Sequence, residues 1–145
     1  MKNLLLFIWQ LPQNLLGFIL SLFAKCNEVY TMNDGEKIKV YYSRHILNCG
    51  VSLGDYIILD YDYYYTPKNK GRYIVNTLNH EHGHQKQSRM LGWLYLLIVG
   101  FTSAVCNNLY DRIFHKKWTE LQRTLWYYNR VPEKWADRLG LVQRW

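Results

Sequence analysis

The sequence has few cysteines, and none in a pattern that stabilises a small fold. Cys26, Cys49 and Cys106 are the three cysteines among 145 residues, an odd number at wide spacing without a CxxC pair. Neither a disulfide framework nor a thiolate zinc site is therefore indicated. The sequence also lacks a repeating period, which excludes collagen-like and solenoid architectures.

Acidic residues are the scarcer charged type. There are 11 Asp and Glu against 18 Lys and Arg, which gives a net charge of +7 and a pI of about 9.3. This balance suits anionic lipid headgroups or nucleic acid. Because the sequence contains no recognisable nucleic-acid-binding module, we expect a membrane rather than nucleic acid as the partner.

The chain does contain enough apolar sequence for one domain. Hydrophobic residues make up 49% and charged residues 20%, which excludes a disordered tail. A chain of this length can bury one core and is too short for two independent domains. Aromatic residues reach 17%, and amphipathic rings favour places where an apolar surface meets water, such as a bilayer interface.

Charge is missing altogether from residues 3–24. This length is close to the ~20 helical residues that cross the hydrocarbon core of a bilayer. The polar residues Gln10, Gln13 and Asn14 interrupt the segment, however, and Pro12 is typical of a kink. We therefore expect residues 1–24 to form a membrane anchor or an interfacial helix, ahead of a single domain over residues 25–145.

The remaining sequence predicts an α+β fold. Residues 29–60 contain short β-branched and aromatic runs separated by turn residues, which predicts a small antiparallel sheet. Helical spacing follows over residues 72–91, and two further helices are expected over residues 111–128 and 132–139. Pro132 suits the first turn of the last helix.

Residues 80–84 read His-Glu-His-Gly-His and match the HExxH pattern. On a helix, His80 and His84 lie one turn apart and can present both imidazoles to one metal ion, with Glu81 beside it. A polar helix face with surface histidines is the alternative, because so short a motif also occurs by chance. The sequence therefore needs a third ligand to support a metal site.

A carboxylate pair further along the chain offers that ligand. Glu133 and Asp137 are four residues apart and share one face of the last expected helix. Catalytic zinc takes three protein ligands and keeps one position for water, and Glu133 can complete this set. Asp137, one turn later, can accept the free ring N–H of a ligand histidine and hold its tautomer.

Together the two motifs resemble the HExxH plus ExxAD pattern of gluzincin zinc peptidases, especially the membrane-bound group that contains the CAAX prenyl endopeptidases and the HtpX-like heat-shock proteases. The resemblance implies that His80, His84 and Glu133 ligate Zn²⁺, that Glu81 is the general base and that Asp137 orients a histidine. It implies hydrolysis of a peptide or protein substrate by zinc-activated water. It also implies that the stretch 50–60 is the edge strand along which the substrate aligns.

The metal hypothesis constrains a second charge-free run, residues 91–106. If this run crossed a bilayer, the histidines and Glu133 would lie on opposite sides. Sixteen helical residues reach about 24 Å, short of a hydrocarbon core of roughly 30 Å. We therefore expect a buried hairpin, or a re-entrant or interfacial element that returns to its starting side.

Two classes of function lead, and a basic nucleic-acid binder is a third reading. The first is a membrane-associated zinc metallopeptidase, whose basic body is expected in the cytoplasm by the positive-inside tendency. The second is a non-catalytic, membrane-associated interaction module with a structural or vestigial metal site. For the peptidase, the partner of the oxyanion is open among Tyr127, Tyr128, Arg130 and His45.

Overall fold

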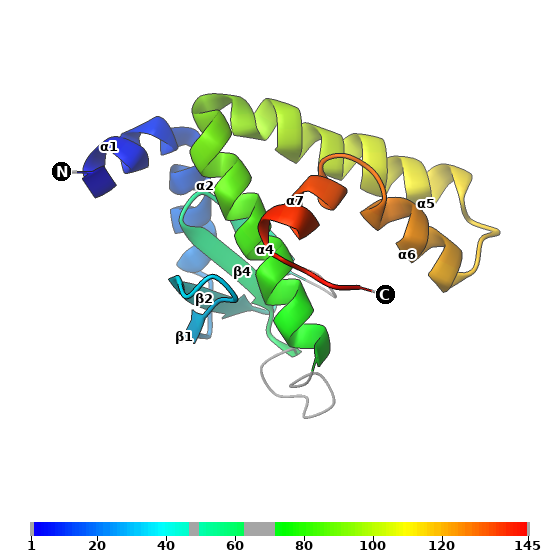
Figure 1. Cartoon of the computed structure of the whole chain (residues 1–145), viewed down its shortest axis with the longest axis horizontal. Helices are drawn as coiled ribbons and strands as arrows, with labels where there is room; N and C mark the ends of the chain where they lie inside the picture. The colour runs from blue at the N-terminus through cyan, green and yellow to red at the C-terminus, as the bar shows by residue number, and fades with distance from the viewer. Residues whose placement is uncertain (1, 47–49, 63–71, 145) are drawn as a thin grey trace.

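The computed structural model describes residues 2–46, 50–62 and 72–144 and has the predicted α+β architecture (Figure 1). A four-stranded sheet lies beside helix α4, which spans Arg72–Leu91, the range expected for the helix with the HExxH motif. A long helical segment extends from the end of α4 at Leu91, and the last helix of the chain returns to pack against α4.

The apolar N-terminal segment forms two helices, α1 (Lys2–Trp9) and α2 (Leu11–Ser21), separated at Gln10. Its polar side chains point inward: Gln10, Gln13 and Asn14 are fully buried. The Gln13 amide donates to Ser88 Oγ at 3.0 Å and to the Gly92 carbonyl at 2.8 Å. The polar interruptions noted in the sequence therefore attach the segment to the body, while most of its large apolar side chains are exposed.

The sheet has the order β1-β2-β4-β3. Its strands are β1 (Cys26–Thr31), β2 (Lys37–Ser43), β3 (Gly50–Leu53) and β4 (Tyr56–Asp60). The pairs β1–β2 and β3–β4 are antiparallel, but β2 and β4 are parallel.

The expected purely antiparallel sheet is therefore wrong, and the sheet is mixed. After β2 the chain passes to the far edge and forms β3, and the turn at Gly54 then brings β4 back between β3 and β2. Residues 57–60 of β4 are all buried, as is typical of a central strand covered on both faces. An apolar strand of this kind is more stable inside the sheet than at its edge.

The hydrophobic core lies between the sheet and α4. Alternate residues of β2 point into it, namely Ile38, Val40 and Tyr42, and Leu78 of α4 packs against them. This period-two pattern is the one that identified the strand in the sequence. The core thus fixes the face of α4 that turns toward the sheet.

After α4 the chain bends at Gly92, whose φ of +54° lies in the left-handed region, and continues as a helical arm over residues 92–114. We call residues 92–114 the long arm. It consists of the 3₁₀ turn η2 (Gly92–Leu94), the π-helical stretches η3 (Leu96–Gly100) and η4 (Thr102–Leu109), and α5 (Tyr110–Phe114).

A hairpin within residues 91–106, one of the alternatives expected there, is therefore wrong. The chain bends by 116° between Val75–Leu94 and Leu96–Phe114, which places the bend near the start of this run. Within the described parts of the chain, no single helix is long and apolar enough to cross a bilayer, and this bent pair meets the criteria only when its two helices are taken together.

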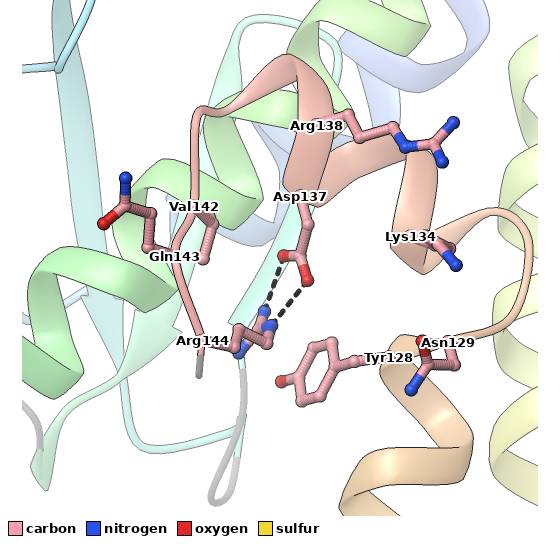
Figure 2. A pocket seen from close by; sticks show the side chains of 8 residues that line it. All are labelled: Tyr128, Asn129, Lys134, Asp137, Arg138, Val142, Gln143 and Arg144. Atoms are coloured by element: carbon pink, nitrogen blue, oxygen red, sulfur yellow. Dashed lines mark hydrogen bonds and ion pairs between the residues drawn. The ribbon is translucent and has the colours of Figure 1, made fainter.

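The chain reverses after α5 and returns beneath the long arm through α6 (Glu120–Tyr128) and α7 (Glu133–Leu139). The single helix expected over 111–128 is thus interrupted, because Thr119 and Gln122 form a capping box that starts α6. Pro132 directly precedes α7 as its N-cap residue. The last residues run back past α7 and bring Arg144 beside Asp137 and Tyr128 (Figure 2).

Candidate metal centre

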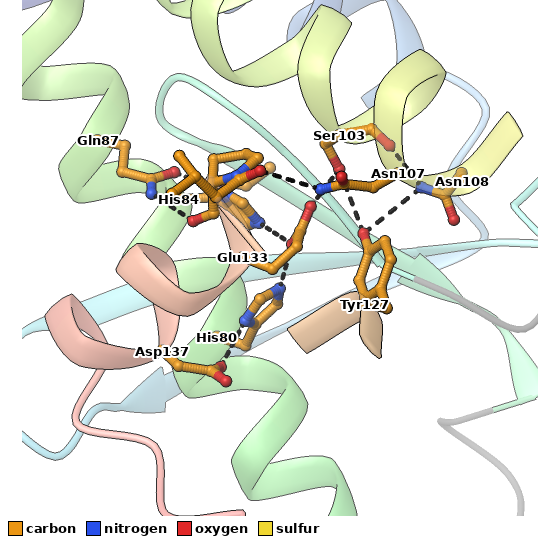
Figure 3. A network of polar contacts seen from close by, with 12 residues as sticks. His80, His84, Gln87, Ser103, Asn107, Asn108, Tyr127, Glu133 and Asp137 are labelled. Carbon is orange, nitrogen blue, oxygen red and sulfur yellow. Dashed lines mark hydrogen bonds and ion pairs between the residues drawn. The ribbon is translucent and has the colours of Figure 1, made fainter. Parts of the chain in front are cut away.

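The structure brings His80, His84 and Glu133 together, as the sequence predicts (Figure 3). The two imidazoles lie one turn apart on α4, with ring centroids 4.7 Å from each other. Nε2 of each ring is 3.1 Å from the same Glu133 oxygen, Oε2. Two zinc ligands with bonds of about 2.0–2.1 Å lie about 3.3 Å apart at a tetrahedral angle, so this spacing fits a shared ion closely.

The outer nitrogens of both rings face hydrogen-bond acceptors. His80 Nδ1 is 2.7 Å from Asp137 Oδ1, and His84 Nδ1 is 2.7 Å from Gln87 Oε1. The Gln87 amide nitrogen donates to the Pro132 carbonyl at 2.9 Å, which fixes the orientation of that amide. Each ring therefore has an acceptor for a proton on Nδ1, which leaves Nε2, the nitrogen next to Glu133, as the atom that would bind a metal ion.

This arrangement attracts positive charge. Burial disfavours the charged, doubly protonated form of the His80 imidazole. Hydrogen bonds to Asp137 and Glu133 outweigh this effect and raise the pKa of His80 to about 9. Burial also opposes ionisation of Glu133, yet its contacts with the two histidines hold the pKa of that carboxyl well below its usual range. In this structure ring protons satisfy the Glu133 carboxylate, and a divalent metal ion between the same three atoms would take the place of those protons.

A close crossing of α4 and α7 places Glu133 over the histidines. A Cβ atom at Gly83 would lie 1.9 Å from the Ala136 carbonyl oxygen, and one at Gly140 would lie 1.9 Å from the Asn79 carbonyl oxygen. Only glycine therefore permits this separation of the two helices. The glycine inside HExxH and the alanine inside ExxAD are the contact point of the two motifs.

Glu81 lies on the sheet side of the same turn. It is buried, and its carboxylate lies against β3, where a Cβ atom at Gly50 would be 2.8 Å from Glu81 Oε1. Burial raises the pKa of Glu81, while the charges of His84 and His80 act in the opposite direction. A carboxyl with a raised pKa beside a metal group is suited to proton transfer.

The stretch expected to form one edge strand contains two strands. Residues 50–53 form β3, which is at the edge of the sheet, but residues 56–60 form the interior strand β4. The edge beside Glu81 is therefore β3 alone. The Tyr95 hydroxyl of the long arm donates to the Ser52 carbonyl at 2.8 Å and attaches the arm to this strand.

Arg144 is a residue of this site that the sequence did not indicate. Its Nη2 donates to Asp137 Oδ1 at 2.7 Å, and its guanidinium carbon lies 3.3 Å from the centroid of the Tyr128 ring. The three side chains line an open pocket of about 490 Å³ with Lys134 and Arg138 (Figure 2). Arg144 thus holds the carboxylate that orients His80.

Ser103 is a second residue that the sequence did not indicate. Its hydroxyl donates to Glu133 Oε1 at 2.5 Å, and the Tyr127 hydroxyl lies 3.2 Å from Ser103 Oγ (Figure 3). Both oxygens of Glu133 are therefore engaged, one by the histidines and the other by the long arm. The sequence does carry a signal for Ser103. It is one of a series of residues at intervals of four that begins within the charge-free run 91–106 and forms the face of the long arm toward the body.

The four candidate oxyanion partners separate into two pairs. The Tyr128 ring packs edge-on against His80 at 5.2 Å, and Tyr127 contacts the group through Ser103. Arg130 instead donates a hydrogen bond to Asn107 and lies over the Trp126 ring. His45 is exposed, and its ring packs edge-on against Phe23. The structure thus brings the two tyrosines to the site and leaves Arg130 and His45 away from it.

His82 points away from the metal group, as expected for a residue between the two ligands. It is buried, and its Nε2 lies 2.9 Å from Asp34 Oδ2 in the β1–β2 turn. Lys86 contacts the same Asp34 oxygen at 2.6 Å, and Arg89 binds both oxygens of Glu36. Three side chains of α4 thus attach this turn to the metal helix.

No protein-family model matches the chain, and no curated protein or solved structure is significantly similar to it. The assignment of a function therefore depends on the geometry of the site.

Proposed function

We propose that the protein is a zinc-dependent peptidase of the gluzincin type. The observation that carries this proposal is the convergence of His80 Nε2, His84 Nε2 and Glu133 Oε2, with a hydrogen-bond acceptor facing the outer nitrogen of each ring. Two neutral imidazoles and one carboxylate are a ligand set of catalytic zinc, which leaves a fourth position for water. The pairing of HExxH with ExxAD gives the same ligands.

Bound zinc supplies a water whose pKa is lowered toward about 7 and polarises the carbonyl that is attacked. In this proposal Glu81 accepts the proton of that water and then delivers it to the leaving amine. Its buried position against β3 and its raised pKa suit this exchange. Tyr127 and Tyr128 are the nearest candidates for a hydrogen bond to the developing oxyanion.

The position of β3 supports a peptide as the substrate. This strand is at the edge of the sheet, and its first residue, Gly50, lies against Glu81. An extended peptide can pair with an edge strand through main-chain hydrogen bonds, which places its backbone in register without requiring a specific side chain. A peptide on this edge would carry its scissile bond past the general base.

A structural metal site is the second candidate function, and burial favours it. His80, His84 and Glu133 are all buried, and Glu133 has no exposed surface. Structural zinc sites are closed in this way, whereas a catalytic site must admit its substrate. In this alternative the ion stabilises the packing of α7 on α4 in a non-catalytic interaction module.

Metal analysis and hydrolysis assays on matched variants separate the two candidates. Wild-type protein is expected to contain one zinc per chain, to lose it in His80→Ala and to keep it in His45→Ala, which removes an exposed histidine away from the site. Glu81→Gln is expected to keep the zinc and lose hydrolysis of unfolded protein substrates. Zinc without turnover in wild type indicates the structural role, and a wild type without zinc contradicts both.

A further inference from the structure

The long arm and α1 present apolar side chains outward rather than inward. One leucine in each helix shows this: Leu5 is 69% exposed in α1, and Leu97 is 69% exposed in the long arm. Leu94 and Phe101 on the arm are also more than half exposed. We call the exposed apolar side chains of α1 and the long arm the outer apolar surface.

The inner side of the long arm carries polar groups instead. Residues 95, 99, 103, 107 and 111 face the body, and all except Val99 make polar contacts there. In a regular α-helix, positions four residues apart drift by about 40° per step, so this stripe would rotate to the far side within the arm. The wider turns of the π-helical stretches η3 and η4 keep it on one face. The arm is thus amphipathic with its polar face buried.

The two halves of the outer apolar surface are continuous. α1 and the long arm meet at Gly92, which packs against the Trp9 ring, and they extend in opposite directions along one edge of the molecule (Figure 1). The two indole N–H groups at this corner donate to main-chain carbonyls, Trp9 to Arg89 and Trp93 to Ile8. Both rings remain about half exposed. Tryptophans that combine a satisfied N–H with an exposed ring are typical of a membrane interface.

Charge distribution favours a lipid surface over a protein partner. Residues 3–24 and 91–110 contain no charged side chain. Most of the exposed charges that follow these segments are basic, namely Lys25 after α2 and Arg112, Lys116 and Lys117 at the end of the arm, and the exposed Glu120 then begins α6. The acidic residue at that end, Asp111, is buried and bound to Arg123. An apolar surface bordered by cations matches acyl chains bordered by anionic headgroups.

We propose that the outer apolar surface lies in the headgroup and upper acyl region of an anionic bilayer, with α1 and the long arm parallel to the membrane plane. The surface is convex, since it consists of the outer sides of two helices, and it therefore suits a deformable lipid layer. This docking does not depend on hydrolysis at the metal group. The polar stripe of the arm keeps its contacts with the body while the opposite face is in lipid.

Flotation of the full chain with vesicles tests this proposal. The wild type is expected to float with vesicles of equimolar phosphatidylcholine and phosphatidylserine, and less well with phosphatidylcholine alone. The double variant Leu97→Glu with Phe101→Glu is expected to lower the partition coefficient about tenfold or more, because it places two charges in the apolar face. Val29→Glu, at a residue of β1 that is 66% exposed, is the matched control and is expected to float like the wild type.

Three results would overturn the proposal. The first is a wild type that does not float, and the second is a double variant that floats as well as the control. The third is a wild type that sediments as a dimer in the absence of lipid while the double variant sediments as a monomer, which would assign the surface to a second copy of the chain. Far-UV circular dichroism and zinc content show whether the double variant is folded. If it is not, Leu97→Ser alone replaces it, with the same expected direction and about a threefold effect.

Discussion

At the scale of single residues, Gln87 shows how a neutral side chain can organise a metal group. Its amide is fully buried and is fixed between the Pro132 carbonyl and the outer nitrogen of His84. It therefore acts on His84 as Asp137 acts on His80. Partners of this kind set the tautomer and the orientation of a ligand ring before any ion binds.

Replacement of Gln87 is expected to weaken metal binding without abolishing it. Gln87→Leu keeps the approximate volume but removes the acceptor for His84 Nδ1, so zinc affinity should fall about 10–100-fold. The measurement is competition with a chromophoric chelator. Gln85→Leu is the matched control, because Gln85 makes the same kind of contact with His82, which points away from the group. Equal losses in both variants would contradict the assigned role.

Asp34 provides a test of the contact between the β1–β2 turn and α4. Burial opposes ionisation, but Lys86, the Glu36 backbone N–H and His82 outweigh it, so the pKa of Asp34 lies well below its usual range. A lowered pKa in the folded state adds stability that is complete above the unfolded value of about 3.9 and is lost as the pH falls through the folded value.

The Asp34→Asn variant should therefore be less stable than the wild type at neutral pH. The difference in the free energy of unfolding is expected to be constant above about pH 5 and to shrink at lower pH. Urea denaturation at a series of pH values measures it. A difference that grows on acidification would have the wrong sign for this account.

At the scale of elements, the metal group depends on how closely α7 approaches α4. The HExxH pattern is local, so the sequence was sufficient to place His80 and His84 on one helix face, and the boundaries of that helix followed from its spacing. The approach of Glu133 to the two histidines was predictable from the ExxAD motif. Its role in binding metal stays a prediction. The partners of Gln87, Ser103 and Arg144 could not be predicted, because they are set by the packing of distant segments.

The sheet gives a second example at this scale. The strands were recognisable because β2 alternates and β4 is continuously apolar. Their order was not, because it depends on where the chain crosses after Ser43. Neighbouring strands in sequence favour antiparallel pairing, and the insertion of β4 between β2 and β3 departs from that tendency.

The contact of Gly83 with Ala136 is the most sensitive point of the helix pair. Gly83→Ala is expected to destabilise the protein by about 1–3 kcal/mol, since the added methyl group meets backbone atoms that cannot rotate away. It should also lower zinc content, because α7 carries Glu133. Thermal denaturation and metal analysis measure the two effects.

Gly100→Ala is the control for that substitution. Gly100 is also helical, but its added Cβ atom would lie 3.7 Å from the nearest atom, in the flexible Leu96 side chain. Stability should be unchanged or slightly higher, since alanine favours helices over glycine by about 1 kcal/mol. If both substitutions had the same effect, the close crossing would not be the cause.

At the scale of the whole molecule, the buried carboxylate links folding to metal. An ion that binds the folded chain alone stabilises it by mass action. Excess chelator is therefore expected to lower the melting temperature of the wild type by about 5 °C or more. Glu133→Gln, which lacks the charged ligand, should melt at nearly the same temperature with and without chelator. Scanning calorimetry decides this, and an equal shift in both proteins would place the ion elsewhere.

The spacing of the inward stripe on the long arm has a consequence for evolution of the chain. Exchange of one outward leucine for another apolar residue leaves the arm intact, whereas deletion of a single residue before Ser103 turns everything beyond it by roughly a quarter of a circle. The serine hydroxyl would then turn away from Glu133 toward the flank of the arm, although the amino-acid composition would hardly differ. Homologous chains should therefore vary freely in which apolar residue occupies each outward position of the arm. They should conserve the number of residues between Gly92 and Ser103.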